Sequence, residues 1–359
     1  MLDDTLFDDP ARLVEADGRG LLRQAALSGA QVRAAVETAA EKGLDDLAEL
    51  RPRALVLLAR PGVGDGVCRV LAALLGPACP VPVVIADSAP SWIGALDVVF
   101  AHTDDGNDQV LAESLSRASR RGATVVVAVP QDGPVAAAGA GRATVLPPRL
   151  PVPPELSFGH AFASGLAVLG ALGLLRTDTE ALADALDRES ERAHPDNDVL
   201  VNPAKSLALR VAEHTPLLWG IEPVGAAVAA HGAFAFGCLA GVACDVADYH
   251  QAVTRTALLR AASSVGSEAD LFADPDERGA GALRVFLVRA RQDDRTEAVE
   301  RAAVRDLPGA DLLSPDGSEQ EDAAVRAGVF AARFDLAAVY LGLASGTVNG
   351  PGWPALAAH

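Results

Sequence analysis

The sequence predicts an α/β protein made of two tandem, doubly wound units with parallel sheets. A short apolar run, a glycine-rich turn and an apolar helix follow one another over residues 54–76. The same order recurs over 215–244, where a short apolar run precedes a long alanine-rich stretch. Strand, turn and helix form the repeating element of parallel α/β sheets, so their recurrence predicts a duplicated fold.

Four short runs rich in Val, Ile and Leu predict the first sheet, at 54–59, 81–87, 96–103 and 123–130. They lack polar alternation, as is typical of parallel strands buried on both faces. A helix is expected over 108–121. Ligands of such sheets bind beyond the carboxyl ends of the strands. The candidate binding loops are therefore 61–66, 87–90, 102–108 and 131–134.

Helices are predicted around these strands and around a second sheet. Residues 1–50 have helical spacing, a proline-rich linker covers 147–156, and helices follow over 157–175 and 178–192. Asn202 is the expected N-cap of the next helix, with Pro203 at its first position. Strands at 215–220 and 283–290 and a helix ending at Gly346 complete the pattern. We expect segments 1–50, 51–150 and 151–346, then a loosely held tail over 347–359.

Composition limits the classes of partner. A formal net charge of -18 in 359 residues argues against nucleic acid and anionic membrane surfaces. No apolar stretch is expected to cross a membrane without interruption. The N-terminus, MLDDTLFDDP, is acidic where a signal peptide is basic, which predicts a cytoplasmic protein. The four cysteines form no C-x-x-C pair, which predicts free thiols, without metal or disulfide.

Two segments carry a resemblance to a known family. One is N-P-A-K-S-L-A (202–208) before the strand that ends in Trp219-Gly220, and the other is D-L-A-A-V-Y-L-G-L-A-S-G (335–346). With the tandem α/β units, they resemble the sugar-isomerase (SIS) superfamily and its bifunctional phosphoglucose/phosphomannose isomerases. More closely, the chain is similar to their divergent actinobacterial, TobH-like branch. The resemblance implies a tandem SIS fold from about residue 51 to 346, a homodimer and hexose 6-phosphate ligands, with no cofactor.

The resemblance and the loops together give candidate substrate-binding residues. Backbone N–H groups at Gly62 and Gly64 are placed to cradle a phosphate at a helix N-terminus. The alternative is a tight strand-to-helix turn, because Asp65 would repel an anion. In the family a Ser/Thr-rich loop follows the third strand; here Thr103, Gly106 and Asn107 remain among three aspartates. The alternative there is an acidic helix N-terminus.

Two more candidates lie in the later loops. Gln131 follows the fourth strand, and Arg149 in the linker is placed either to reach a phosphate or to face solvent.

Aldose–ketose isomerisation needs a carboxylate base, a ring-opening group and a cation for the enediolate. The family's glutamate falls near Cys238, in a stretch without carboxylates from Ala226 to Cys244. A lysine of the family falls near Gly241. His250 lies near the ring-opening histidine and is the one catalytic candidate, with a structural role as the alternative. His231, inside the apolar helix, is expected to be a paired core histidine.

The hypothesis that follows is a phosphosugar-binding protein with weak or degenerate isomerase activity. The alternative is a non-catalytic phosphosugar-sensing or scaffold homodimer, with its interface at 157–175 or 224–244. A third hypothesis, an NAD(P)-dependent oxidoreductase, uses Gly62–Gly66 and Asp87. It conflicts with the spacing, which is G-x-G-x-G and not G-x-G-x-x-G.

Overall fold

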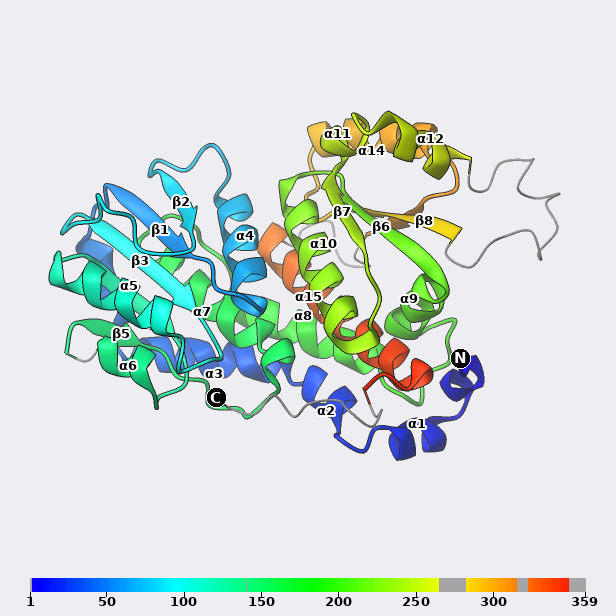
Figure 1. Cartoon of the computed structure of the whole chain (residues 1–359), viewed down its shortest axis with the longest axis horizontal. Helices are drawn as coiled ribbons and strands as arrows, with labels where there is room; N and C mark the ends of the chain where they lie inside the picture. Colours follow the sequence, from blue (N-terminus) through cyan, green and yellow to red (C-terminus); the bar gives the residue numbers. More distant parts are fainter. Residues whose placement is uncertain (1, 140, 265–281, 315–321, 349–359) are drawn as a thin grey trace. The chain divides into compact units, whose positions relative to one another are not determined.

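The computed structural model describes residues 2–139, 141–264, 282–314 and 322–348. The chain forms two compact units, each around one parallel sheet (Figure 1). Residues 26–187 form the β1–β5 unit, and residues 2–25 with 188–348 form the β6–β9 unit. The predicted boundary at 150/151 thus lies inside the β1–β5 unit, because the helix after the linker packs on the first sheet.

The first sheet has the strand order β2-β1-β3-β4-β5, and every pairing is parallel. Its strands are β1 (Ala54–Leu58), β2 (Val83–Ala86), β3 (Asp97–His102), β4 (Thr124–Ala128) and β5 (Ala143–Val145). The four predicted strands are confirmed. The expectation that all are buried on both faces is wrong for β2, which lies at the sheet edge with Ile85 40% exposed.

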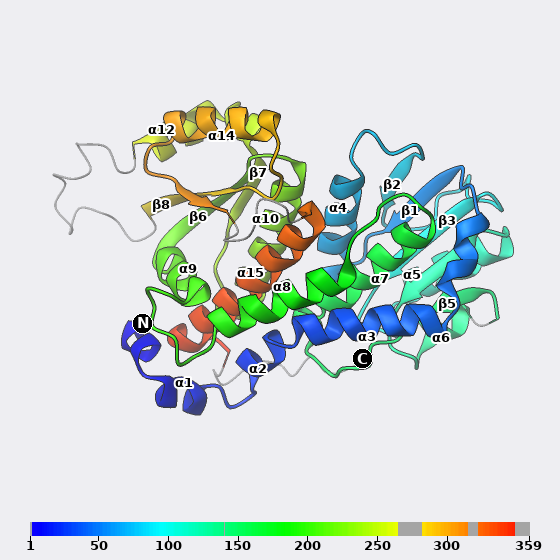
Figure 2. The ribbon, with the colours of Figure 1, turned by 180° about the vertical axis from the view of Figure 1, so that it is seen from behind.

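Helices cover both faces of this sheet. Side chains of α5 and α6 complete the core on one face, while α4 and α7 pack on the other face and α3 lies beside α7 (Figure 2). The helices are α3 (Ser28–Glu41), α4 (Val63–Leu75), α5 (Gln109–Arg120), α6 (Pro134–Ala138), α7 (Phe158–Ala171) and α8 (Thr179–Arg192), which runs on into the β6–β9 unit. The predicted helix 157–175 is shorter than expected, because the chain turns at Gly173 with φ 68°.

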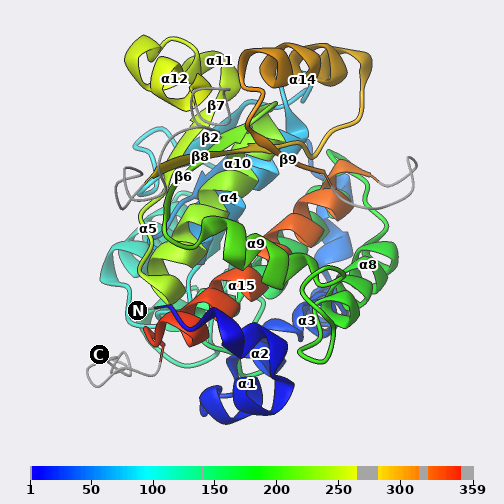
Figure 3. The same ribbon diagram turned by 90° about the vertical axis from the view of Figure 1, so that its right-hand side faces the viewer.

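The second sheet has the order β7-β6-β8-β9 and is also parallel. Its strands are β6 (His214–Gly220), β7 (Asp245–Asp248), β8 (Ala282–Val288) and β9 (Asp311–Leu313). Helices α11 (Tyr249–Ala252), α12 (Thr256–Ser263) and α14 (Asp294–Asp306) cover one face, with α10 (Pro223–Ala235) on the other (Figure 3). Helices α1 (Pro10–Ala16), α2 (Leu21–Ala25), α9 (Pro203–Val211) and α15 (Ala323–Ser345) complete the unit.

Local signals in this unit agree with the structure. The side chain of Asn202 caps α9 with Pro203 at its first position, and Gly346, at φ 70°, ends α15. Helix α10 continues into a π-helical turn over Phe236–Ala240 and stops at Gly241. The predicted tail lies outside the described residues except for Thr347 and Val348. These two residues are fixed to the β6–β9 unit, because Thr347 Oγ1 donates a hydrogen bond to Leu239 O and Val348 is buried.

Two helical segments, Pro223–Ala240 and α15, are long and apolar enough to span a membrane, contrary to the sequence expectation. Their apolar windows are 61% and 100% buried within the protein, so much of this surface already contacts protein. Helix α15 also buries charged groups in pairs: Arg333 binds Glu189, and Asp335 Oδ1 lies 2.8 Å from His231 Nε2. His231 is therefore the paired core histidine that the sequence predicted.

The two apolar helices that the sequence offered for a dimer interface are used inside their own units. Helix α7 packs on α3 and α4, and α10 packs on β6 and α15. The homodimer stays a prediction. All four cysteines are free, and burial raises the pKa of Cys68 and of Cys244 to about 12.

Candidate functional site

A cluster of buried polar side chains lies where β3 ends. His102 is the last residue of β3; its Nδ1 lies 3.1 Å from the carbonyl oxygen of Ala128, at the end of β4. Its Nε2 lies 3.2 Å from Asp104 Oδ2. The imidazole thus joins the two strand ends and positions the Asp104 carboxylate at the carboxyl edge of the sheet, where ligands of such folds bind.

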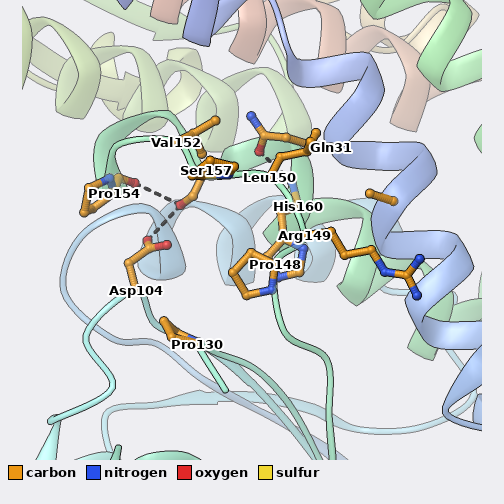
Figure 4. A pocket seen from close by; sticks show the side chains of 12 residues that line it. Gln31, Asp104, Pro130, Pro148, Arg149, Leu150, Val152, Pro154, Ser157 and His160 are labelled. Atoms are coloured by element: carbon orange, nitrogen blue, oxygen red, sulfur yellow. Dashed lines mark hydrogen bonds between the residues drawn. The ribbon is translucent and has the colours of Figure 1, made fainter. Parts of the chain in front are cut away.

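Two further polar residues come from the start of α7 (Figure 4). The hydroxyl of Ser157 lies 2.8 Å from Asp104 Oδ2 and 2.9 Å from Pro154 O, so its one proton goes to one oxygen at a time. One turn later, the ring of His160 lies 6.0 Å from that of His102, centroid to centroid. The chain after the linker therefore places Ser157 and His160 next to the end of β3.

Burial and charge fix the protonation of this cluster. Burial alone would raise the pKa of Asp104, but the charge of His102 and hydrogen bonds from His102 and Ser157 outweigh it, so this pKa is lowered. Burial and then the neighbouring His102 lower the pKa of His160 to about 4. At neutral pH the site thus holds an ionised Asp104 and a neutral His160, whose Nε2 has no hydrogen-bond partner within the described residues.

A cavity of about 150 Å³ adjoins the cluster and is lined by Asp104, Ser157, His160, Gln31, Arg149 and several prolines (Figure 4). Since a liquid water takes up about 30 Å³, it has room for roughly five waters or a small ligand. The side chain of Gln31 is engaged: Nε2 donates to Leu156 O and Oε1 accepts from His160 N. Asp104, Ser157 and the Nε2 atom of His160 are therefore the groups available to bind a hydroxyl-bearing ligand.

Arg149, a predicted phosphate ligand, lines this cavity, but acidic side chains already compensate its charge. Its guanidinium forms ion pairs with Glu37, at 2.9 Å, and with Glu41. These carboxylates, Glu41 first, raise the pKa of Arg149. The side chain is thus held by α3 at the rim of the cavity.

The glycines after β1 have a structural role. Gly62, at φ 93°, precedes the first residue of α4. A Cβ on Gly64 would lie 2.6 Å from the carbonyl oxygen of His102, so only glycine allows this close packing of α4 on the end of β3. Asp65 forms an ion pair with Arg69 along α4. This geometry fits the tight-turn alternative.

The loop after β3 is occupied by its own polar groups. Thr103 is buried and its Oγ1 accepts from Asp105 N at 3.2 Å, while Asn107 N donates to Asp105 Oδ1 at 2.9 Å. Gly106 packs against the backbone of Asp132, where a Cβ would lie 2.6 Å from a carbonyl oxygen. Gln131, in the next loop, is exposed.

Asp108 occupies the N-terminus of α5. It accepts from Leu111 N at 2.9 Å and pairs with Arg60, from the end of β1, at 2.6 Å and 3.1 Å. Both side chains are nearly buried, at 10% and 12% exposure. The N-terminus of a helix and an arginine are groups that bind a phosphate. Here the Asp108 carboxylate binds both the helix N-terminus and Arg60. This arrangement fits the alternative given above, an acidic helix N-terminus.

The second sheet has a counterpart in Glu222, between β6 and α10. Its carboxylate accepts from Val224 N and Gly225 N, at 2.7 and 2.8 Å, and from Ala290 N and Arg291 N beyond β8, at 3.0 and 3.2 Å. Glu222 is 6% exposed. Four backbone N–H groups at this edge are thus bound by an internal anion.

The catalytic candidate His250 belongs to the β6–β9 unit. It is exposed in the short helix α11, where its backbone N–H donates to Asp248 Oδ1 at 2.9 Å. Sequence reasoning passed over Ser157, His160 and Glu222. In the sequence their signals are weak: Ser157 is only the start of a predicted helix, and Glu222 is only a residue before Pro223.

No protein-family model and no curated protein sequence matches this chain, but solved structures do. The chain has the tandem SIS fold. Its two parallel sheets match the C-terminal domain of glucosamine-fructose-6-phosphate aminotransferase from Francisella tularensis, with TM-score 0.59, 10% identity and coverage of 91% of this chain and 96% of that one. The predicted fold class is confirmed.

Other matches have the same fold. Tagatose-6-phosphate ketose/aldose isomerase from Escherichia coli gives TM-score 0.57 at 15% identity, covering 87% of this chain and 91% of that one. A hypothetical protein from Thermus thermophilus gives TM-score 0.63 at 13% sequence identity, covering 94% of this chain and 89% of that one. At these identities the likeness to tandem SIS proteins is one of fold alone.

Proposed function

We propose that this chain is a catalytically degenerate relative of the phosphoglucose/phosphomannose isomerases, of the TobH-like type, that binds a sugar ligand with little or no turnover. The fold that it shares with a ketose/aldose isomerase supports the sugar class of ligand. The Asp108–Arg60 ion pair at the N-terminus of α5 is the observation that carries the proposed loss of activity.

A phosphate dianion at the N-terminus of α5 would have to displace Asp108 from Arg60 and from the N–H of Leu111. It would also approach the other carboxylates of this loop. Two unit charges about 4 Å apart interact by about 4 kcal/mol at an effective dielectric constant of about 20. Repulsion of this size should offset the attraction of Arg60 and weaken the binding of hexose 6-phosphates at this loop.

The chemical groups for isomerisation are also missing from the expected places. Cys238 lies on the π-helical turn after α10, in a stretch that contains no carboxylate. Lys205 is a structural residue, because its Nζ donates to the carbonyl oxygens of Phe7, Pro195 and Asn197. Loss of a general base typically lowers the rate about 10²- to 10⁴-fold.

The cavity beside Asp104 and Ser157 supports sugar binding without turnover. A carboxylate and a hydroxyl accept hydrogen bonds from sugar hydroxyls, and the charge of Arg149 is compensated by Glu37 and Glu41. We therefore propose that the sugar hydroxyls bind here and that the protein acts as a sensor or scaffold.

The test is calorimetric titration with hexoses and with hexose 6-phosphates. A hexose should bind, the 6-phosphate should bind no tighter at this cavity, and Asp104→Asn should weaken hexose binding by about tenfold. Asp65→Asn is the matched control, because Asp65 belongs to the same unit but pairs with Arg69 outside the cavity. Hexose binding that is absent, or unchanged in Asp104→Asn, would contradict the proposal.

A further inference from the structure

His160 carries a buried hydrogen-bonding atom that the described chain does not satisfy. The residue is 4% exposed, and its Nε2 has no hydrogen-bond partner among the residues that the structure describes. A buried polar atom without a partner costs free energy, and most such atoms in proteins are bound by another group of the protein, by water or by a ligand. Because His160 lines the cavity beside Asp104, a ligand in that cavity can supply the partner (Figure 4).

The other ring nitrogen fixes the tautomer of His160. Burial and the neighbouring His102 lower the pKa of His160, whereas Asp104 and a hydrogen bond to the backbone of Leu146 raise it. Because Nε2 has no partner, the bond to Leu146 involves Nδ1. A backbone group that favours the protonated ring is a carbonyl oxygen that accepts, so Nδ1 carries the proton. Nε2 therefore keeps its lone pair and is an acceptor.

Asp104 supplies a second acceptor. Its Oδ2 lies 3.2 Å from His102 Nε2 and accepts from the Ser157 hydroxyl at 2.8 Å. Within the described ranges no hydrogen bond reaches its other oxygen, Oδ1, and the side chain is 23% exposed. An ionised carboxylate can only accept hydrogen bonds. Asp104 Oδ1 and His160 Nε2 thus give the cavity two acceptors from two different segments.

The donors that line the cavity are already engaged. The proton of Ser157 goes to Asp104 or to Pro154, and the side-chain amide of Gln31 donates to the backbone before α7. Arg149 is paired with two glutamates of α3. A ligand that donates hydrogen bonds finds partners here, whereas a ligand that only accepts them has to compete with bonds that the protein has already made.

We infer that this cavity selects its ligand by the direction of the hydrogen bonds, and that it takes a sugar with two free hydroxyls. One hydroxyl donates to Asp104 Oδ1 and the other donates to His160 Nε2. This inference rests on the proposed function, sugar binding in this cavity, and adds His160 as a residue that determines specificity. A sugar in which fluorine replaces either hydroxyl keeps a small polar group but loses the proton that the site requires.

The test is calorimetric titration of the whole protein with glucose, with mannose and with the derivatives of each in which fluorine replaces one hydroxyl at a time. Two derivatives of the hexose that binds should bind at least about fivefold more weakly than the parent sugar. In His160→Phe, the parent sugar should also bind about fivefold more weakly. One of the two derivatives should then bind as well as the parent, because the acceptor for that hydroxyl is gone.

Ser164→Ala is the matched control. Ser164 lies one turn after His160 on α7, is fully buried, and its Oγ also has no partner in the part of the chain that the structure describes. Ser164 does not line the cavity. Its loss should therefore change the affinity for each sugar by less than about twofold. If His160→Phe does not fold, His160→Leu removes the same acceptor and should give the same pattern.

The outcomes separate this inference from the proposed function. Absence of binding by both glucose and mannose would refute the two together. Hexose binding in which the fluorine derivatives lose the same affinity in His160→Phe as in the unmodified protein would overturn this inference alone. Equal losses in the His160 variant and in Ser164→Ala would also overturn it, because they would point to the packing of α7 and not to an acceptor in the cavity.

Discussion

The carboxyl edges of the two sheets differ in how a carboxylate is used. In the β6–β9 unit, Glu222 binds four backbone N–H groups from two segments and so joins α10 to the chain beyond β8. In the β1–β5 unit, Asp108 binds one backbone N–H and pairs with Arg60. A separate cavity at this edge is lined by Asp104 and Ser157.

This difference shows that a carboxylate at the carboxyl edge of an α/β sheet can serve structure in one unit, while the same edge of the other unit keeps room for a ligand. Glu222 acts as an internal anion that the surrounding backbone requires. Asp108 is held chiefly by a side-chain ion pair, which a substitution can release. Substitutions at the β6–β9 edge should therefore lower the stability of the protein, whereas substitutions at the β1–β5 edge should change ligand binding.

The largest expected effect is on stability, from Glu222→Ala. Removal of the buried carboxylate leaves four N–H groups without an acceptor, which should cost about 4 kcal/mol. Glu222→Gln keeps one acceptor oxygen and should cost less. The measurement is urea unfolding followed by tryptophan fluorescence, with Trp92→Phe and Trp353→Phe in both proteins so that buried Trp219 reports on the β6–β9 unit. A loss below about 1 kcal/mol in Glu222→Ala would show that Glu222 is not essential to this edge.

The next effect is on the pH dependence of the stability of the β1–β5 unit. The pKa of His160 falls from its ordinary 6.5 to about 4 in the folded protein. Between these values the unfolded chain binds a proton and the folded chain does not, so stability falls as pH drops from 6.5 to 4. The expected loss is about 3 kcal/mol.

His160→Phe keeps an aromatic ring and removes this titration. Unfolding free energies measured from pH 4.5 to 7 should therefore have a shallower slope in the variant, whatever its absolute stability. Equal slopes in the two proteins would mean that His160 titrates normally in the fold.

The smallest effect is on binding, from Asp108→Ser. Serine keeps a cap for α5 but removes the carboxylate that neutralises Arg60. We expect hexose 6-phosphates to bind about tenfold more tightly, corresponding to about 1.4 kcal/mol. Thermal-shift titration measures this, with the double variant Asp108→Ser/Arg60→Gln as control. Unchanged affinity in Asp108→Ser would remove Asp108 as the barrier to phosphate.

The sequence predicts much of the fold because long apolar runs dominate it. Strands β1, β2, β3, β4, β6 and β8 follow from such runs. The short strands β5, β7 and β9 have three or four residues, and β7 and β9 contain aspartate, so no apolar run marks them. The caps at Asn202 and Gly346 are local signals and were predictable.

The candidate site was less predictable because its members come from distant segments. Ser157 meets Asp104 across a proline-rich linker, and Glu222 binds N–H groups that lie 68 and 69 residues later. No spacing within the sequence encodes such contacts. The acidic helix start at Asp108 was predictable as a local pattern, whereas its partner, Arg60, required the order of the strands in the sheet.

The most direct test of the central claim is a coupled assay of the purified protein for interconversion of glucose 6-phosphate, mannose 6-phosphate and fructose 6-phosphate. With the N-terminus of α5 occupied by Asp108, and with no carboxylate in the sequence from Ala226 to Cys244, the protein should turn over well below about one per second on each of them. A rate of several per second on any of the three, abolished by His250→Ala, would contradict catalytic degeneracy.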